Sequence, residues 1–277
     1  MKKKITSFLM FLLLPLIIIY LLIGVLFYFH QEKLFFKPIK LGKEYTFDFK
    51  GDFEEINSIT KDGTLLNSLL FKVKKPKGVI FYLHGNGNSL EKFGKLAPIY
   101  TNIGYDIFMT DYRGYGKSEG SLSNEDQLYK DNQFLYNELK KKYTEEEIII
   151  IGYSLGSSLA AKLASENSPK LLVLKAPFYN FKDVANHTTI LTRLYPFHLL
   201  SNYHFKTNEF IQQCKMPLLI FHGTDDEVIY YGSSLKLKEY FKTTDRLFRI
   251  EGEKHRTIID NPIYIKELTS FLLSDNK

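Results

Sequence analysis

A short stretch in the middle of the chain carries the residue types of a nucleophilic centre. The pentapeptide GYSLG directly follows four isoleucines, and in it Ser154 stands between Gly152 and Gly156. A serine hydroxyl is a weak nucleophile at neutral pH and needs a neighbouring base. A sharp strand-to-helix turn would expose this hydroxyl, and the free N–H groups of the helix start would stabilise an oxyanion beside it. The pattern predicts a nucleophile at Ser154, with a structural serine in a glycine-rich turn as the alternative.

The flanking elements fit this position. From residue 78 onward short apolar runs alternate with longer amphipathic stretches. The apolar runs are 78–84, 105–112, 147–153, 171–177, 217–223 and 246–252, and the amphipathic stretches are 89–104, 124–143, 154–167, 232–243 and 262–274. Continuous apolar strands that alternate with helices predict a mostly parallel sheet covered by helices on both faces. Ligands of such sheets bind at the carboxyl ends of the strands, which is where Ser154 lies.

Two further regions flank this pattern. Residues 45–50 and 53–73 alternate apolar and polar side chains, and Asp62-Gly63 is a hairpin turn signal, so we expect antiparallel strands first. Residues 178–213 are too long for a simple connection and predict a short helical cap. The cap is rich in aromatic residues, which either pack it onto the domain or line an apolar acyl pocket: Phe178, Tyr179, Phe181, Tyr195, Phe197, Tyr203 and Phe205.

The N-terminal segment predicts a membrane anchor. Residues 5–29 contain no charged side chain, and a helix of about 25 residues rising about 1.5 Å each covers a hydrocarbon core of roughly 30 Å. We expect an uncleaved signal anchor; a cleaved signal peptide and a buried core helix are the alternatives. The lysine cluster at positions 2–4 favours a cytoplasmic N-terminus, with the catalytic domain on the non-cytoplasmic side.

We therefore expect three parts in the chain: an anchor (1–30), a juxtamembrane linker (31–43) and a catalytic domain (44–277) with the cap at about 178–213. Much of the formal net charge of +6 comes from lysines that bracket the apolar segment, which indicates membrane flanking rather than nucleic-acid binding. No metal-ligand spacing occurs, and residues 111–118 end like a phosphate-binding loop but carry Asp111 where that loop requires glycine. We therefore expect no cofactor and no metal.

Five segments resemble the α/β-hydrolase fold serine hydrolases, and the resemblance covers nearly the whole region after the anchor. In chain order they are FYLHGNGNS, DYRGYGKSEG, GYSLG, HGTDDEVI and EGEKH. The chain is most similar to small-capped, often membrane-anchored α/β-hydrolase-domain proteins, which include depalmitoylating thioesterases. The resemblance implies the α/β-hydrolase fold and a nucleophile, acid and histidine in that chain order.

The resemblance also assigns the site residues. His255 follows the expected acid loop and is implied as the base. Asp226, two residues before a valine, is implied as the acid, with Asp225 as the alternative. Asp183 would be the acid only if that residue had migrated to the loop after the preceding strand, and we expect it to be a solvated side chain. Backbone N–H groups of Leu155 and Asn86 are implied as the oxyanion hole.

Together these features predict a serine hydrolase that cleaves a carboxylic ester or thioester through an acyl-enzyme. The membrane anchor suits a lipid or an acylated protein as substrate. An amide or peptide hydrolase with the same triad and a non-catalytic scaffold of this fold are the alternatives. The acyl chain, the leaving group and the oligomeric state stay open.

Overall fold

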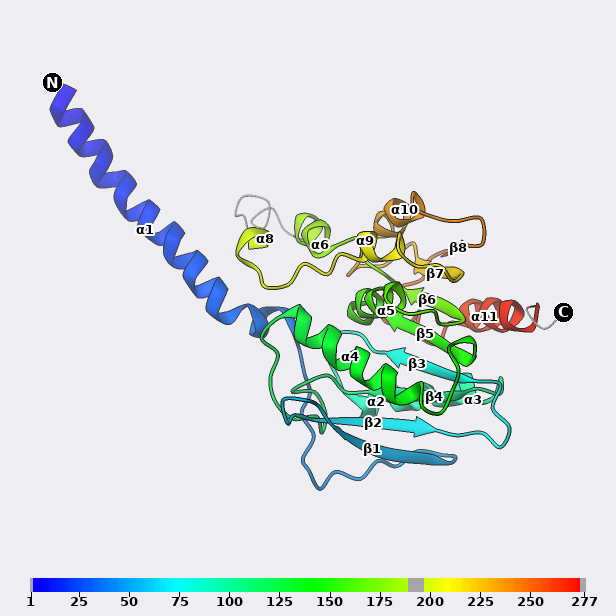
Figure 1. Cartoon of the computed structure of the whole chain (residues 1–277). Coiled ribbons are helices and arrows are strands. Elements are labelled where there is room, and N and C mark those ends of the chain that lie inside the picture. Colours follow the sequence, from blue (N-terminus) through cyan, green and yellow to red (C-terminus); the bar gives the residue numbers. More distant parts are fainter. Residues whose placement is uncertain (1, 189–196, 275–277) are drawn as a thin grey trace.

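The computed structural model of the chain describes residues 2–188 and 197–274 and contains one eight-stranded sheet (Figure 1). The strands are β1 (Phe53–Ile59), β2 (Leu65–Phe71), β3 (Val79–Leu83), β4 (Asp106–Thr110), β5 (Ile148–Tyr153), β6 (Leu171–Lys175), β7 (Leu218–Gly223) and β8 (Arg246–Ile250). Their order across the sheet is β1-β2-β4-β3-β5-β6-β7-β8. The β1–β2 and β2–β4 pairs are antiparallel and all other pairs are parallel, which confirms the predicted α/β-hydrolase architecture.

The four consecutive isoleucines of β5 show why the sheet is covered on both faces. Successive side chains of a strand point to opposite faces. Ile148 and Ile150 pack in one core with helices α4 (Glu125–Leu139), α5 (Leu155–Ser165) and α10 (Gly232–Lys238). Ile149 and Ile151 pack in a second core with α2 (Leu90–Phe93), α3 (Ala97–Thr101) and α11 (Pro262–Ser274). The uninterrupted apolar run is therefore a strand buried on both sides, as predicted.

In its described residues, 178–188 and 197–213, the cap contains three short helices, α6 (Phe181–Thr188), α8 (Phe197–Leu200) and α9 (Thr207–Ile211). In Figure 1, α6 and α8 lie near the end of the molecule toward which β3 points, so the cap stands at the carboxyl edge of the parallel strands. Phe178, Tyr203 and Phe205 are buried and pack the cap onto the domain. The predicted cap residue Tyr195 lies outside the described residues.

Helix α1 (Lys2–Phe35) projects away from the domain (Figure 1). Its 34 residues correspond to about 51 Å at 1.5 Å per residue. The most apolar 18 residues within 11–35 have a mean hydropathy of 2.8, so this helix is long and apolar enough to cross a membrane. The helix also continues through residues 31–35, the first part of the segment that we expect to be a linker.

One predicted strand is absent. Residues 45–50 form no strand in the described structure, although their apolar residues alternate. The rings of Tyr45, Phe47 and Phe49 instead follow one another along the second core, with centroids 5.2 Å and 5.8 Å apart. Phe49 also contacts Phe71 of β2, at 5.4 Å between centroids. Ring packing on the sheet, rather than strand pairing, explains the alternation here.

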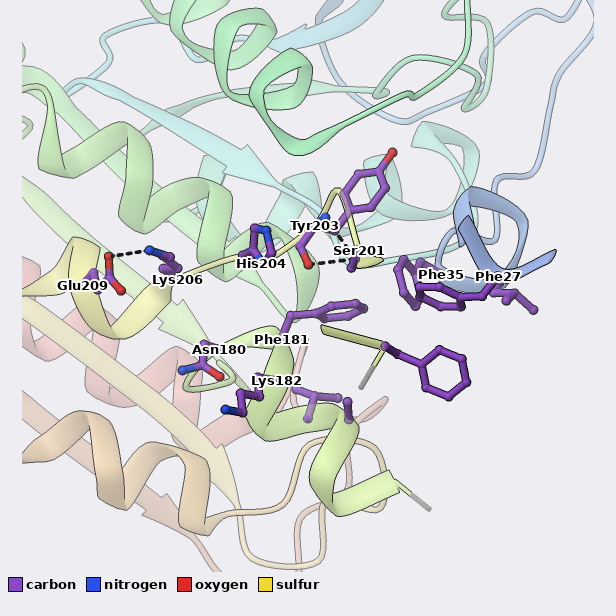
Figure 2. A pocket seen from close by; sticks show the side chains of 14 residues that line it. Phe27, Phe35, Asn180, Phe181, Lys182, Ser201, Tyr203, His204, Lys206 and Glu209 are labelled. Atoms are coloured by element: carbon purple, nitrogen blue, oxygen red, sulfur yellow. Dashed lines mark hydrogen bonds and ion pairs between the residues drawn. The ribbon is translucent and has the colours of Figure 1, made fainter. Parts of the chain in front are cut away.

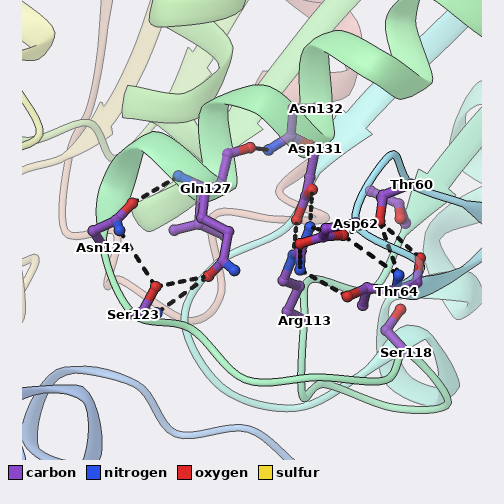
Figure 3. A network of polar contacts seen from close by, with 12 residues as sticks. Thr60, Asp62, Thr64, Arg113, Ser118, Ser123, Asn124, Gln127, Asp131 and Asn132 are labelled. Atoms are coloured by element: carbon purple, nitrogen blue, oxygen red, sulfur yellow. Dashed lines mark hydrogen bonds and ion pairs between the residues drawn. The ribbon is translucent and has the colours of Figure 1, made fainter.

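A buried arginine ties the first hairpin to the sheet and to α4 (Figure 3). Arg113 follows β4, and its guanidinium donates to both carboxylate oxygens of Asp131 on α4, at 2.6 Å and 2.7 Å. It also donates to Asp62 in the β1–β2 turn, at 2.7 Å. Arginine suits such paired contacts because its planar group presents donors in a fixed fork. The segment that resembles a phosphate-binding loop is thus held by carboxylates.

We predict that replacing this arginine destabilises the protein strongly. Arg113→Leu leaves the buried Asp131 carboxylate without its charge partner, and breaking a buried ion pair costs about 3–5 kcal/mol. Thermal unfolding of the full chain in detergent micelles should show a clearly lower melting temperature. Lys141→Leu, which removes the exposed Lys141–Glu138 pair, is the matched control and should change it little. Equal effects of the two variants would contradict the structural role of Arg113.

Candidate active site

Ser154 occupies a strained turn between β5 and α5. Its φ of 52° and ψ of −116° are unusual for a residue with a side chain. The Ser154 N–H donates to the carbonyl of Lys175 in β6 at 2.9 Å, and the Ser154 carbonyl accepts from the Ser157 hydroxyl at 2.5 Å. These bonds on both sides of the residue hold the turn. The side chain of Ser154 is therefore lifted off the end of the strand, as the elbow motif predicts.

The two glycines of the motif allow this turn to pack tightly. A Cβ atom added at Gly156 would stand 2.1 Å from the carbonyl oxygen of Leu83 in β3. One added at Gly152 would stand 2.3 Å from the carbonyl oxygen of Gly156. Both distances are shorter than any van der Waals contact permits. The elbow can approach β3 because Gly156 carries no side chain, and α5 can fold back onto β5 because Gly152 carries none.

His255 reaches Ser154 from the loop that follows β8. Its Nε2 lies 3.0 Å from the Ser154 Oγ, and its Nδ1 lies 2.7 Å from the Asp226 Oδ2. The carboxylate can only accept from Nδ1–H, which leaves Nε2 free to accept the serine proton. The Tyr153 hydroxyl donates to the His255 carbonyl at 2.9 Å and fixes the histidine loop to the elbow. All three side chains are buried.

Asp226 lies in the loop after β7, and its carboxylate accepts several hydrogen bonds. Its Oδ1 accepts the N–H groups of Val228 and Ile229, at 2.9 Å and 2.7 Å. Burial alone would raise the pKa of the Asp226 carboxyl, but hydrogen bonds from His222 and His255 outweigh burial and hold that pKa well below its usual range. Asp226 is therefore a stable anion beside His255.

His222 is a contact of the acid that motif reasoning did not single out. Its Nε2 lies 2.9 Å from the Ile229 carbonyl and 3.2 Å from the Asp226 Oδ2, while its Nδ1 lies 2.7 Å from the Ser234 Oγ. The ring is fully buried at the end of β7. Its position four residues before Asp226, on a strand that enters the acid loop, is the only sequence signal for this contact.

The two alternative carboxylates are placed elsewhere. Asp225 is exposed, and its carboxylate accepts from Thr224 at 3.2 Å. Asp183 is not solvated, so that expectation was wrong. It is buried on α6, where it accepts from Lys236 at 2.5 Å and from the Tyr230 hydroxyl at 2.8 Å. An ion pair with a residue about fifty positions away cannot be read from the sequence around Asp183.

The loop after β3 lies against the elbow. A Cβ atom added at Gly85 would stand 3.4 Å from the Ser154 Cβ and 2.8 Å from the Tyr153 ring. Asn86 follows, and its exposed side chain binds the end of α1: Nδ2 donates to the Phe35 carbonyl at 2.5 Å, and Oδ1 accepts the Lys37 N–H at 3.0 Å. Gly85, the residue before Asn86, thus lies against Ser154, while the Asn86 side chain contacts the helix that precedes the domain.

A family model described as serine aminopeptidase, S33, matches residues 74–209, just under half of the chain; this part contains Ser154 but neither Asp226 nor His255. Alpha/beta hydrolase domain-containing protein 17C of Xenopus laevis is 30% identical over 220 residues, which cover 77% of this chain and 67% of that protein. Lysophosphatidylserine lipase ABHD12 of Danio rerio is 27% identical over 228 residues, which cover 70% of this chain and 58% of that protein.

Solved structures share the fold at low sequence identity. Esterase Pf2001 of Pyrococcus furiosus matches with a TM-score of 0.66 at 19% identity, over 86% of this chain and 95% of that one. Est1E of Butyrivibrio proteoclasticus, solved with ferulic acid bound, matches with a TM-score of 0.66 at 20% identity, over 79% of this chain and 98% of that one. These matches support the sheet and helix arrangement described above.

The lowered pKa of Asp226 predicts how its contribution to stability changes with pH. A carboxyl whose pKa is lower in the folded state than in the unfolded chain stabilises the fold above the unfolded pKa of about 3.9, and this contribution disappears as the pH falls toward the folded pKa. Asp226→Asn should therefore lower the melting temperature at pH 7, and its difference from the wild type should shrink between about pH 5 and pH 3.

Asp225→Asn is the matched control, because its carboxylate is exposed and lies outside the contacts of His255. It should leave the melting temperature nearly unchanged at every pH. A pH-independent difference between Asp226→Asn and the wild type would show that charge on Asp226 does not stabilise the fold.

Proposed function

The chain belongs to the α/β-hydrolase family, and on that premise we propose that it is a serine hydrolase that cleaves a carboxylic ester or thioester. The observation that carries the proposal is the continuous hydrogen-bond chain from the Ser154 Oγ through His255 to Asp226, with links of 3.0 Å and 2.7 Å. A hydroxyl, an imidazole and a carboxylate in this order are the groups that nucleophilic acyl transfer requires.

The reaction proceeds in two steps. The Ser154 Oγ attacks the acyl carbon while His255 Nε2 accepts its proton, and the imidazolium that forms is stabilised by the Asp226 anion. His255 then donates that proton to the leaving alcohol or thiol, and an acyl-enzyme remains on Ser154. In the second step His255 takes a proton from water, the hydroxide attacks the acyl carbon, and the acid product leaves as Ser154 regains its proton.

The oxyanion of each tetrahedral intermediate is received by the backbone N–H groups of Leu155 and Asn86. Leu155 is the first residue of α5, where N–H groups have no partner within the helix. Asn86 is brought to the elbow by the close approach of Gly85 to Ser154. Removal of one such donor commonly costs about 2.7–4 kcal/mol of transition-state stabilisation.

The substrate is a lipid or an acylated protein, and the protein is held in the membrane by α1. The apolar length of this helix supports anchoring, and one relative is named a lysophosphatidylserine lipase. The other candidate function is hydrolysis of an amide or peptide with the same triad. It is favoured by the description of the matching family model as a serine aminopeptidase.

Covalent labelling tests the catalytic proposal. A fluorophosphonate probe should label the wild-type chain, and Ser154→Ala should abolish labelling and lower ester hydrolysis by about 10⁴-fold or more, because no other group replaces the nucleophile. Ser165→Ala, on the same helix but outside the triad, should label normally. Esters, thioesters and amides of one acyl group then decide between the two functions.

Two outcomes would overturn this proposal. A folded wild-type chain that takes up no probe would be a scaffold rather than an enzyme. Labelling that persists in Ser154→Ala would place the nucleophile on another residue.

The catalytic domain lies on the non-cytoplasmic side. The lysines at positions 2–4 precede the apolar segment, and cytoplasmic flanks of spanning helices are enriched in positive charge. A membrane-impermeant version of the probe should therefore label Ser154 in intact cells as strongly as in lysed cells. Labelling that appears only after lysis would place the domain in the cytoplasm.

A further inference from the structure

A cavity of about 470 Å³ lies between the end of α1 and the cap (Figure 2). Its apolar wall comes from two parts of the chain that are far apart in sequence. Phe27, Leu34 and Phe35 belong to α1, while Phe181, Val184 and Phe197 belong to the cap. The volume falls within the range of about 300–1,000 Å³ that is usual for small-molecule sites.

The end of α1 is fixed against the cap, so this wall is part of the folded domain. The rings of Phe27 and Phe197 lie 4.6 Å apart, and those of Phe35 and Phe181 lie 4.5 Å apart. Gln31 is fully buried between these rings along the helix, and its Oε1 accepts the Asn202 N–H at 2.8 Å. A helix that only tethered the domain would not need a buried glutamine that binds the cap.

The cavity offers a ligand a largely apolar wall, with polar side chains gathered toward the Lys206 end. In Figure 2 the rings of Phe27, Phe35 and Phe181 lie toward one side, and Lys206 and Glu209 lie toward the other. Lys206 and Glu209 pair with each other at 3.2 Å. The Ser201 hydroxyl donates to the Tyr203 carbonyl at 3.0 Å. The favoured occupant is therefore a hydrocarbon chain.

The cavity begins where the apolar part of α1 ends. About 20 residues suffice to cross a hydrocarbon core of about 30 Å, and the uncharged apolar segment of α1 ends at Phe29. Phe27 and Leu34 are seven residues apart and thus share one face of the helix. Phe27 therefore belongs both to the apolar segment and to the wall of the cavity.

A chain of direct contacts links the cavity to the catalytic residues. The ring of Phe35 lines the cavity, and the Phe35 carbonyl accepts from Asn86 at 2.5 Å. Asn86 follows Gly85, which approaches the Cβ of Ser154. The cavity wall is therefore hydrogen-bonded, through Phe35, to the loop that is proposed to receive the oxyanion.

We propose that this cavity binds the hydrocarbon chain of the acyl group, with the membrane helix itself as one wall of the substrate site. The proposal rests on the serine hydrolase function and names its substrate class as long-chain acyl esters or thioesters drawn from the bilayer. The acyl carbon reaches Ser154 while its chain lies between α1 and α6.

Acyl-chain length gives the first test. With full-length protein in mixed micelles, kcat/KM for a series of acyl esters should rise from two carbons to at least ten, by up to about fourfold for each methylene that enters the cavity. Ala185→Phe on α6, which fills the cavity, should lower kcat/KM for the hexadecanoyl ester at least tenfold and change that for the acetyl ester less than twofold.

Leu199→Phe is the matched control, because Leu199 is an exposed cap residue outside the cavity lining. It should leave the whole series unchanged. A flat wild-type series, or a uniform loss at all chain lengths in Ala185→Phe, would overturn the proposal.

Photolabelling separates a failure of this proposal from a failure of the hydrolase function. A photoactivatable hexadecanoic acid should crosslink the full-length Ser154→Ala chain within residues 27–35 and 181–185, and Ala185→Phe should reduce that crosslinking. Crosslinking there without ester hydrolysis by the wild type would keep the chain site and overturn the enzyme. Acetyl ester hydrolysis without crosslinking there would keep the enzyme and overturn the chain site.

Discussion

The left-handed turn at Ser154 is the constraint on which the rest of the structure depends. A residue with a side chain adopts such a conformation only when its surroundings hold it there. Gly156 lets the turn pack against β3, Gly152 lets α5 pack against β5, and the Lys175 carbonyl and Ser157 hydroxyl bind the backbone of the turn. A side chain at Gly156 would push the elbow off β3, and one at Gly152 would push α5 off β5, so either would displace the Ser154 hydroxyl from His255.

The parallel sheet and the turn at Ser154 could be predicted because each is marked by residues that are adjacent in the sequence. Four isoleucines in a row indicate a strand buried on both faces, and GYSLG marks the turn that follows. The contact of His222 with Asp226 and the ion pair of Asp183 with Lys236 could not be predicted, since they join residues from different elements. The strand predicted at residues 45–50 was wrong because rings that pack on a sheet and strands that pair in it produce the same alternation of apolar and polar residues.

Helix α1 and the domain form one structural unit. The family resemblance implies a role only for the backbone N–H of Asn86. The Asn86 side chain also binds the Phe35 carbonyl and the Lys37 N–H. Gln31, one turn earlier on the same helix, binds the cap through the Asn202 N–H. The helix that would hold the protein in a bilayer thus contacts both the loop beside Ser154 and the cap above it, which links membrane position to the geometry of the site.

The central claim is that the elbow presents Ser154 to His255 with two backbone N–H groups beside it. A crystal structure of the full chain with an alkyl boronic acid tests this claim most directly. The account predicts a boron atom bonded to the Ser154 Oγ, with one boronate oxygen about 2.7–3.1 Å from the N–H groups of Leu155 and Asn86. Boron bonded to another residue, or a boronate oxygen that meets neither N–H group, would contradict it.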